Sequence, residues 1–370
     1  MRTGIFIVLT LIKFTMKISV SDTQKQNIAT VSAIILLILT VIFSDKVQSA
    51  VTQSIRNCLN VIIPCVFPVT VISFFIIESG FPVKLKLIAN RVMLPLFGLS
   101  GNCLEGVLLG LTGGYNTAVK CAVKMQEENT VGEEQTKRIA LLFTNPGISF
   151  TVLLTGVTLT CSLLTGLRIY AETVFYNLLI AYIYNKIHKL TDDKRVIRRE
   201  TDITEAFISS VEASSRVIIS ISFNIIIFSC FICLVDNIFP FISLPLKLIT
   251  EVSTAVLYSA SAFPLCVTAG VLTFGGLCIF IQNLKDLRAL KVKPSSFLAI
   301  RIIHAIFVTA TEYGFSLLFP ESVTTASYFP VKISASDNIT GSLSLIFLCL
   351  VFLYSVNNIK SLRQPTKKVF

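Results

Sequence analysis

The sequence is poor in charge and lacks the motifs by which soluble enzymes are recognised. Only 14% of its 370 residues are charged, and no polar stretch is long enough to fold as a separate soluble domain, which argues against a receptor or a fused enzyme. It has two histidines, without HExxH or GxSxG, so we expect no enzyme activity. The nucleotide-binding loop GxxxxGK(S/T) is also missing, so any transport would be passive or driven by a gradient.

The alternation of polar and apolar residues that marks a membrane barrel is missing too. Segments such as SAIILLILTVIF and FNIIIFSCFICLV are apolar on every side. With 53% hydrophobic residues, a mean hydropathy of +0.77 and repeated apolar runs between short polar connections, the sequence predicts an all-α polytopic membrane protein. The lipid bilayer is therefore its first expected partner.

The net charge of +11 indicates topology rather than nucleic-acid binding. The Lys and Arg residues lie in loops that flank the apolar runs, without interleaved aromatic residues or a basic domain. Ten cysteines are scattered through the apolar segments, and the tightest pair, Cys230 and Cys233, lies inside a predicted span. We therefore predict no nucleic-acid partner, no metal site and no cofactor.

The apolar runs divide the chain into two membrane halves, 28–185 and 203–357. A charged loop at 186–202 separates them, and an N-terminal segment, 1–27, and a basic tail, 358–370, flank them; translation starts at Met1 or Met16. Two regions contain shorter apolar pieces cut by Pro, Gly and polar residues, as in re-entrant hairpins: 81–127 and 237–290. The predicted full spans are 28–44, 61–78, 136–156, 160–185, 216–235, 295–319 and 340–357.

The halves share an order of short motifs, which predicts an internal duplication. Each has a Phe-Pro pair at the end of a span, then a glycine pair, a polar-faced helix, a charged turn and a long span with an arginine near its start. The matched positions are Phe81 and Phe239, Pro82 and Pro240, Gly113 and Gly275, Gly114 and Gly276, and Arg138 and Arg301.

Basic residues set the expected orientation. The loop NKIHKLTDDKRVIRRE carries six Lys or Arg and is expected on the cytoplasmic side. FPVKLKLIANR carries three and its counterpart FPFISLPLKLIT one, which places them on opposite sides and predicts an inverted repeat. The tail IKSLRQPTKKVF carries four Lys or Arg, yet this topology places it outside the cell unless the second interrupted region crosses the whole membrane. Both alternatives stay open.

The stretch GGYNTAVKCAVKMQEENTVGEEQTKRIALLFTNPGISF, together with Gly275, Gly276, Gln282, Arg301 and His304, resembles the sporulation integral membrane protein YlbJ (SpoVV) family. The resemblance covers most of residues 28–357. It implies two inverted repeats, each with a hairpin, of the gate type shared with concentrative nucleoside transporters and the ferrous-iron permease FeoB. It also implies a role in endospore formation, as a transporter of dipicolinic acid across the outer forespore membrane of a bacterial cell.

The glycine pairs predict a substrate site. Gly113 and Gly114 allow a sharp turn, and the helix after them presents unpaired N–H groups and a positive dipole end to a ligand. Asn116 and Lys120 follow on one face of that helix, with Lys120 deepest. The candidate substrate-binding residues are Gly113, Gly114, Tyr115, Asn116, Lys120, Asn145, Gly275, Gly276, Gln282, Arg301 and His304.

The residue types in this set favour an anion. Arg301 and His304 share one helix face, and two helix N-termini, Lys120 and a bidentate Arg301 would form a cage for the two carboxylates of dipicolinate. A nucleoside would need carboxylate and amide partners for its ribose hydroxyls, and acidic residues are scarce in the apolar segments. Asn145, which precedes a proline, predicts a helix break whose carbonyl groups face a cavity.

Other interpretations stay open. The lysines of the first helix could snorkel to the interface or pair with nearby glutamates, and Arg301 could be an interfacial anchor. Glu172 is spaced for a local salt bridge with Arg168, and Glu312 is a candidate for proton coupling. The whole protein could instead be a non-transporting sporulation scaffold or a nucleoside permease, and its oligomeric state, a homo-oligomer included, is open.

Overall fold

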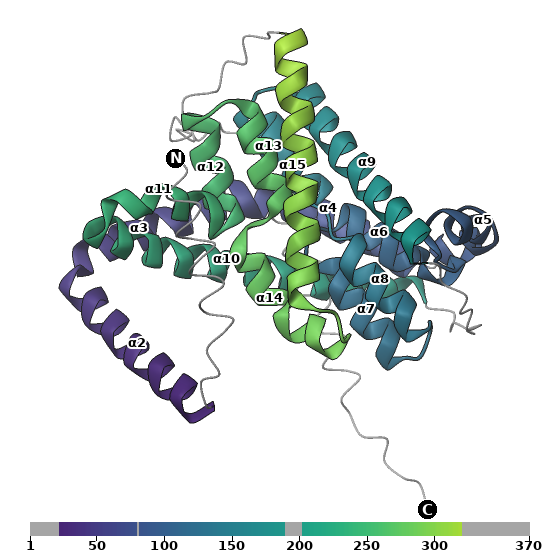
Figure 1. Cartoon of the computed structure of the whole chain (residues 1–370), viewed down its shortest axis with the longest axis horizontal. Helices are drawn as coiled ribbons and strands as arrows, with labels where there is room; N and C mark the ends of the chain where they lie inside the picture. The colour runs from purple at the N-terminus through teal and green to yellow at the C-terminus, as the bar shows by residue number, and fades with distance from the viewer. Residues whose placement is uncertain (1–21, 80, 189–201, 320–370) are drawn as a thin grey trace, which may run out of the picture.

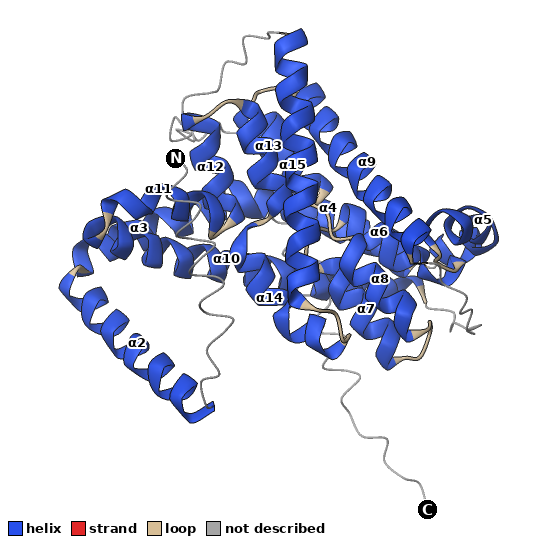
Figure 2. Cartoon of the chain, viewed as in Figure 1, coloured by secondary structure: helices blue, strands red, loops and turns tan. Residues whose placement is uncertain are grey.

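The computed structural model describes residues 22–79, 81–188 and 202–319, and the regular structure within these ranges is helical throughout (Figure 2). The first half contains α2 (Asp22–Ile42), α3 (Ser44–Asn57), the π-helix η1 (Cys58–Ile62), α4 (Ile63–Glu78), α5 (Phe81–Phe97), the 3-10 helix η2 (Gly101–Cys103), α6 (Leu104–Thr112), α7 (Thr117–Glu127), α8 (Glu133–Leu142), the π-helix η3 (Ser149–Leu159) and α9 (Leu163–Ile187). The second half contains α10 (Ile203–Ile238), α11 (Pro240–Ile249), α12 (Val252–Ala262), α13 (Leu265–Phe274), α14 (Gly276–Ala289) and α15 (Pro294–Leu318).

Four helices in the described ranges are long and apolar enough to cross a membrane. They are Ser44–Glu78, which joins α3, η1 and α4, and Ile203–Ile238, Leu265–Ala289 and Pro294–Leu318. Two bent pairs, α5 with α6 and α11 with α12, raise the number to six if each pair is one span. These helices are consistent with the predicted multi-pass integral membrane protein.

Three of the seven predicted spans coincide with these candidate helices, and the predicted span 160–185 matches α9, which is helical but is not one of the candidates. The predicted spans 61–78, 216–235 and 295–319 match parts of the candidate spans, and 28–44 matches the apolar part of α2, which projects from the other helices (Figure 1). The predicted span 340–357 lies outside the described residues, as do the tail and most of the N-terminal segment and the charged loop.

The predicted continuous span at 136–156 is wrong. α8 ends at Leu142, residues 143–147 are not helical, and η3 begins at Ser149 directly after the helical residue Ile148. Pro146 explains the break, because a proline cannot donate a helical hydrogen bond and it disfavours the helical conformation of Asn145 before it. The helix break predicted at Asn145 is thereby confirmed. The next helix, α9, starts after Ser162, whose Oγ accepts a hydrogen bond from Thr165 N at 3.1 Å.

The two interrupted regions are both broken, but they differ in geometry. α5 and α6 bend by 99°, and α6 then packs against α7 after a turn at the first glycine pair. α11 and α12 bend by 112°, whereas α13 and α14 together form the candidate span Leu265–Ala289, interrupted at Gly275. By length and composition the second region therefore supports a full crossing, one of the two alternatives left open by the basic tail.

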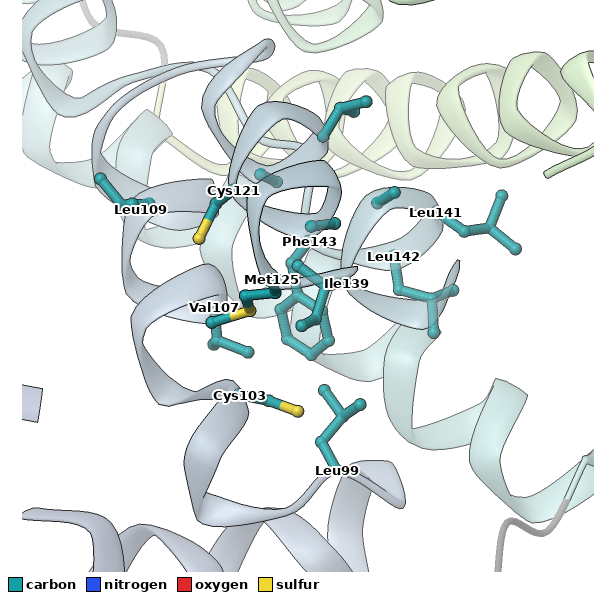
Figure 3. Packing of buried hydrophobic residues seen from close by; sticks show 14 of the residues in the cluster. Leu99, Cys103, Val107, Leu109, Cys121, Met125, Ile139, Leu141, Leu142 and Phe143 are labelled. Carbon is teal, nitrogen blue, oxygen red and sulfur yellow. The ribbon is translucent and has the colours of Figure 1, made fainter. Parts of the chain in front are cut away.

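The molecule buries two apolar clusters and exposes an apolar surface. Between α6, α7 and α8, the side chains of Met125, Ile139 and Phe143 lie close together (Figure 3), and the rings of Phe97 and Phe143 meet edge to face at 5.5 Å. A second cluster joins α4, η3, α12, α13 and α15. The outer faces of α4 and α10 are apolar and open, with Ile72 58% and Phe223 64% exposed, as expected of helices that face lipid.

Candidate functional site

Each predicted glycine pair lies directly before a helix, where the backbone takes up conformations that favour glycine. Gly114, with φ +105°, precedes α7, and Gly275 and Gly276, with φ +83° and +80°, lie at the start of α14. Thr117 Oγ1 donates to the carbonyl oxygens of Gly114 and Leu109, both at 2.6 Å, which fixes the start of α7. α7 and α14 pack against each other, and the ring of Tyr115, which follows the first glycine pair, lies against Gly275 of the second pair.

Buried amides join the two helix starts. Asn116 Nδ2 donates to Gln282 Oε1 at 2.6 Å, and Asn283 Nδ2 donates to Asn116 Oδ1 at 2.8 Å. Asn283 is 1% exposed, so this bridge between the halves is shielded from water. Asn116 and Gln282 were both predicted as site residues. Asn283 was not predicted. Its only sequence signal is that it is a second amide residue directly after Gln282.

Tyr115 fills the space between the halves. Its ring lies against Gly275, where an added Cβ would approach Tyr115 Cε1 to 2.9 Å, and its hydroxyl donates to the carbonyl oxygen of Leu272. The guanidinium carbon of Arg301 lies 5.5 Å from the centre of the same ring, within range of a cation–π contact. Tyr115 therefore separates Arg301 from the space around the helix starts.

Arg301 is a buried cation held by backbone groups. It is 3% exposed, and its two terminal nitrogens donate to the carbonyl oxygens of Thr144, in the break after α8, and of Thr273, at the end of α13. No carboxylate among the described residues pairs with it, and its Nε is buried without a hydrogen-bond partner. Arg301 thus contacts one interrupted helix of each half and has no protein counter-charge in the described ranges.

His304 and Asn145 complete this buried layer. His304 Nε2 lies 2.9 Å from the carbonyl oxygen of Thr173, so the ring donates from Nε2, and Nδ1 faces Arg301 Nη1 at 3.5 Å. Asn145 Nδ2 is 3.4 Å from Thr173 Oγ1, and Asn145 Oδ1 is buried without a partner. Both side chains pack against α9, and neither lines a cavity described below.

A cavity of about 50 Å³, which we call the central cavity, lies where the halves meet. The first turns of α7, α12 and α14 all line it, so three positive helix ends converge there. Its volume suffices for a few water molecules rather than for a substrate. The lining residues are Val66, Gly113, Gly114, Tyr115, Asn116, Thr117, Gly147, Ser149, Phe150, Val217, Ile221, Asn224, Glu251, Val252, Cys278, Ile279 and Gln282.

Glu251 is the charged side chain of the central cavity and was not predicted. It is 3% exposed and caps α12, with Oε1 accepting from Ser253 N at 2.8 Å and Oε2 from Thr254 N at 2.7 Å. The sequence signal was the acidic residue of ITEVSTAV, directly before a Ser-Thr pair and an apolar helix. Acidic residues are therefore less scarce at the site than the sequence suggested.

Lys120 does not join the others, so the predicted cage of Lys120 and Arg301 is not formed in this structure. The buried face of α7 consists of small and apolar residues, and Lys120 lies on the exposed side. There it lines a separate cavity of about 280 Å³ between α4, α6, α7 and α10, together with Glu105 and Arg216. Its neighbour Lys124 pairs with Glu78 of α4 at 3.7 Å rather than with the glutamates of its own helix.

The expected pairing of Arg168 with Glu172 is replaced by a contact between the halves. Arg168 of α9 donates to both carboxylate oxygens of Glu312 on α15, at 3.0 and 3.2 Å, and stacks on Phe315 at 3.8 Å. Glu312, which had no evident partner in the sequence, is therefore part of an ion pair. Glu172 lies beside this pair, with its carboxyl group near that of Glu312, and its Oε2 is buried without a hydrogen-bond partner among the described residues.

No protein-family model, curated protein or solved structure matches the chain. Its function is therefore inferred from the site itself and from the motifs of the sequence.

Proposed function

We propose that the protein is a secondary transporter or facilitator of a small anion, with its substrate site where α7, α12 and α14 meet. The observation that carries this proposal is Arg301, a cation 3% exposed, placed between the two halves without a carboxylate partner in the described residues. Removing a charge from water is costly unless something compensates it, and the two carbonyl groups bound by Arg301 do so only in part. An anionic substrate would supply the counter-charge.

The surrounding helix ends support the same choice. Three helix N-termini line the central cavity and add partial positive charge, and Glu251 already caps that of α12. A membrane scaffold would gain nothing from interrupted helices around a buried cation. Because Tyr115 separates the cavity from Arg301 and the cavity is small, substrate binding requires a second conformation in which α7 and α14 move apart and Tyr115 leaves its place.

Dipicolinate is the anion that the YlbJ-type motifs suggest. Its two carboxylates suit a site with one bidentate guanidinium and several helix N-termini. With this substrate, the protein would act during endospore formation in the outer forespore membrane, and its halves would be inverted gate-type repeats. The shared order of a glycine pair and a helix start in each half supports such a duplication.

The deciding measurement is dipicolinic acid in sporulating cells that lack this protein, assayed separately in mother cell and spore. We expect it to be made in the mother cell and to be missing from the spore, with recovery on expression of the wild-type chain. Normal spore dipicolinate would contradict this substrate and would favour a scaffold or another solute.

A neutral polar solute such as a nucleoside is the second candidate. The central cavity offers the carboxylate of Glu251 and the amides of Asn116, Asn224 and Gln282, which are the partners that ribose hydroxyls need. Uptake of labelled uridine and labelled dipicolinate into the same vesicles separates the two, because each candidate predicts movement of one compound and no competition by the other.

A further inference from the structure

A second and larger space lies on the other side of Glu251. This groove, of about 690 Å³, runs between α3, α10 and α12 and is rich in hydroxyl and amide groups. Ser253 and Thr254, whose backbone N–H groups hold the Glu251 carboxylate, line it. Glu251 therefore stands between the central cavity and this groove, which we call the polar groove.

Ser253 contacts Glu251 of the central cavity through its backbone N–H and also lines the polar groove. It is 1% exposed, and its hydroxyl lies close to the Glu251 carboxylate. A hydroxyl group both donates and accepts hydrogen bonds, so one placed between a carboxylate and a groove can pass a proton from water to that carboxylate. Water in the groove would reach the neighbourhood of the Glu251 carboxylate through this hydroxyl.

The charge state of Glu251 decides what the central cavity can hold. The carboxylate is the charged side chain of a small cavity where three positive helix ends meet. When Glu251 is ionised, its carboxylate already neutralises these helix ends, and an anionic substrate in the same cavity would be repelled because the site has a low dielectric constant. With Glu251 protonated, the same helix ends and Arg301 are left with positive charge that an anion can neutralise.

The other groups around Glu251 do not offer an alternative. Cys278 of α14 and Tyr115 line the central cavity, and Cys58 of η1 is near enough to feel the charge of Glu251. In the polar groove, Asp236 is already paired with Lys247 of α11 at 3.2 Å. Cys233 and Tyr258 also line the groove, and the residues of α10 and η3 that line the central cavity include no charged group.

We propose that Glu251 binds a proton from the polar groove whenever the central cavity takes up an anion, so that the protein moves one proton together with each anion. The step is an addition of H⁺ to one carboxylate oxygen on binding and its loss on release, so no other reactant is needed. This inference rests on the proposed anion transport and names its coupling ion.

The test uses the full-length protein in sealed vesicles with labelled dipicolinate as the probe. For the wild type, an inward proton gradient accelerates uptake, and dipicolinate entry acidifies the lumen, read with a trapped pH dye. As the pH rises, dipicolinate binding should weaken about tenfold per pH unit over the range in which Glu251 loses its proton, because one proton binds with each anion.

Three variants separate coupling from folding. Glu251→Gln is neutral at every pH, so it should bind dipicolinate with a pH-independent affinity, retain exchange of internal for external dipicolinate and lose acidification of the lumen. Glu251→Asp keeps a titrating carboxylate and should restore the pH dependence. Glu134→Gln, which removes an exposed carboxyl group of α8 that lines neither space, should behave as the wild type. Dipicolinate's own titration is common to all four proteins, so their differences isolate Glu251.

The outcomes distinguish this inference from the proposed function. If Glu251→Gln keeps the wild-type pH slope and the acidification, the inference is overturned while anion transport stands. The inference is also overturned if Glu251→Gln weakens uridine binding equally at every pH, because Glu251 would then be a hydrogen-bond partner of a neutral substrate. Wild-type vesicles that neither bind nor move dipicolinate would overturn the proposed function and this inference with it.

Discussion

Arg301 of α15 donates a hydrogen bond to the carbonyl oxygen of Thr144, in the break between α8 and η3. A second bond from the same guanidinium goes to Thr273 at the end of α13. One side chain thus connects an interrupted segment of the first half with one of the second half. A helix break leaves carbonyl groups unpaired, and a buried guanidinium satisfies them with two of its five donors.

Arg301→Ala should abolish dipicolinate uptake while the protein still inserts and accumulates. Loss of the guanidinium leaves the Thr273 carbonyl without its side-chain donor, at a cost of about 1–3 kcal/mol in the free energy of unfolding. Arg301→Lys keeps the positive charge but loses the two separate terminal nitrogens of the guanidinium, so it should retain part of the uptake. Uptake into vesicles and thermal unfolding in detergent measure the two effects separately.

Lys120→Ala tests whether the second cation of the predicted cage is also required for uptake. The cage predicted from sequence requires both cations, whereas the structure places Lys120 in a different cavity. We therefore expect uptake to survive in Lys120→Ala and to disappear in Arg301→Ala. Equal loss in both would mean that Lys120 reaches the substrate in another conformation.

Gly275→Ala should destabilise the junction of α13 and α14. Its φ of +83° is unfavourable for alanine, by about 1–3 kcal/mol, and the added Cβ would press on the Tyr115 ring. Gly314→Ala is the matched control, since it lies in α15 with nothing within 4 Å of an added Cβ and should be neutral or stabilising by up to about 1 kcal/mol. Equal unfolding midpoints for the two variants would contradict this account of Gly275.

The class of fold and the helix breaks could be predicted from sequence because both depend on local chemistry. Apolar runs without alternation predict membrane helices, Pro146 interrupts one of them, and glycines mark the junctions before α7 and α14. The span at 136–156 was predicted as continuous because hydropathy averages over a window and does not register a single proline.

The partners of the site residues could not be predicted, because they come from segments far apart in the chain. The bridge between Asn116 and Asn283 depends on how the halves pack. The exposure of Lys120 is likewise decided by which face of α7 is buried, and a spacing of four residues does not fix that. Glu251 was missed because a capping carboxylate at a short break resembles an ordinary helix start.

Glu312→Gln should be among the more destabilising single substitutions in the second half. Glu312 is 2% exposed and pairs bidentately with Arg168, so its removal leaves a partly buried guanidinium unpaired, at a cost of about 3 kcal/mol. Glu172→Gln, one turn from Arg168 on α9, should cost less because Glu172 is a carboxyl neighbour of Glu312 and makes no bidentate pair with Arg168. Unfolding free energies of Glu312→Gln, of Arg168→Met and of the double variant that combines these two substitutions measure the coupling, and additive effects would contradict it.

The ion pair of Glu133 with Lys291 predicts a pH dependence outside the membrane helices. Lys291 Nζ lies 3.0 Å from Glu133 Oε1 and connects the turn after α14 to the start of α8, and Lys137 Nζ lies 3.1 Å from the same oxygen. The hydrogen bond from Lys291, followed by that from Lys137, holds the pKa of Glu133 below its ordinary value of 4.5. The stabilisation is therefore fully present above 4.5 and is lost as the pH falls through the lower folded-state pKa.

Glu133→Gln should remove this component of the acid sensitivity. The wild-type unfolding midpoint should fall more steeply than that of the variant as the pH is lowered from neutral through the titration range of Glu133, and high salt should reduce the difference because the pair is exposed. Lys291→Gln removes the largest cause of the shift and should reproduce most of the effect, whereas Glu134→Gln removes a carboxylate that pairs within α8 and should not mimic it. Parallel midpoint curves for wild type and Glu133→Gln would show that this contact between the halves does not contribute to stability.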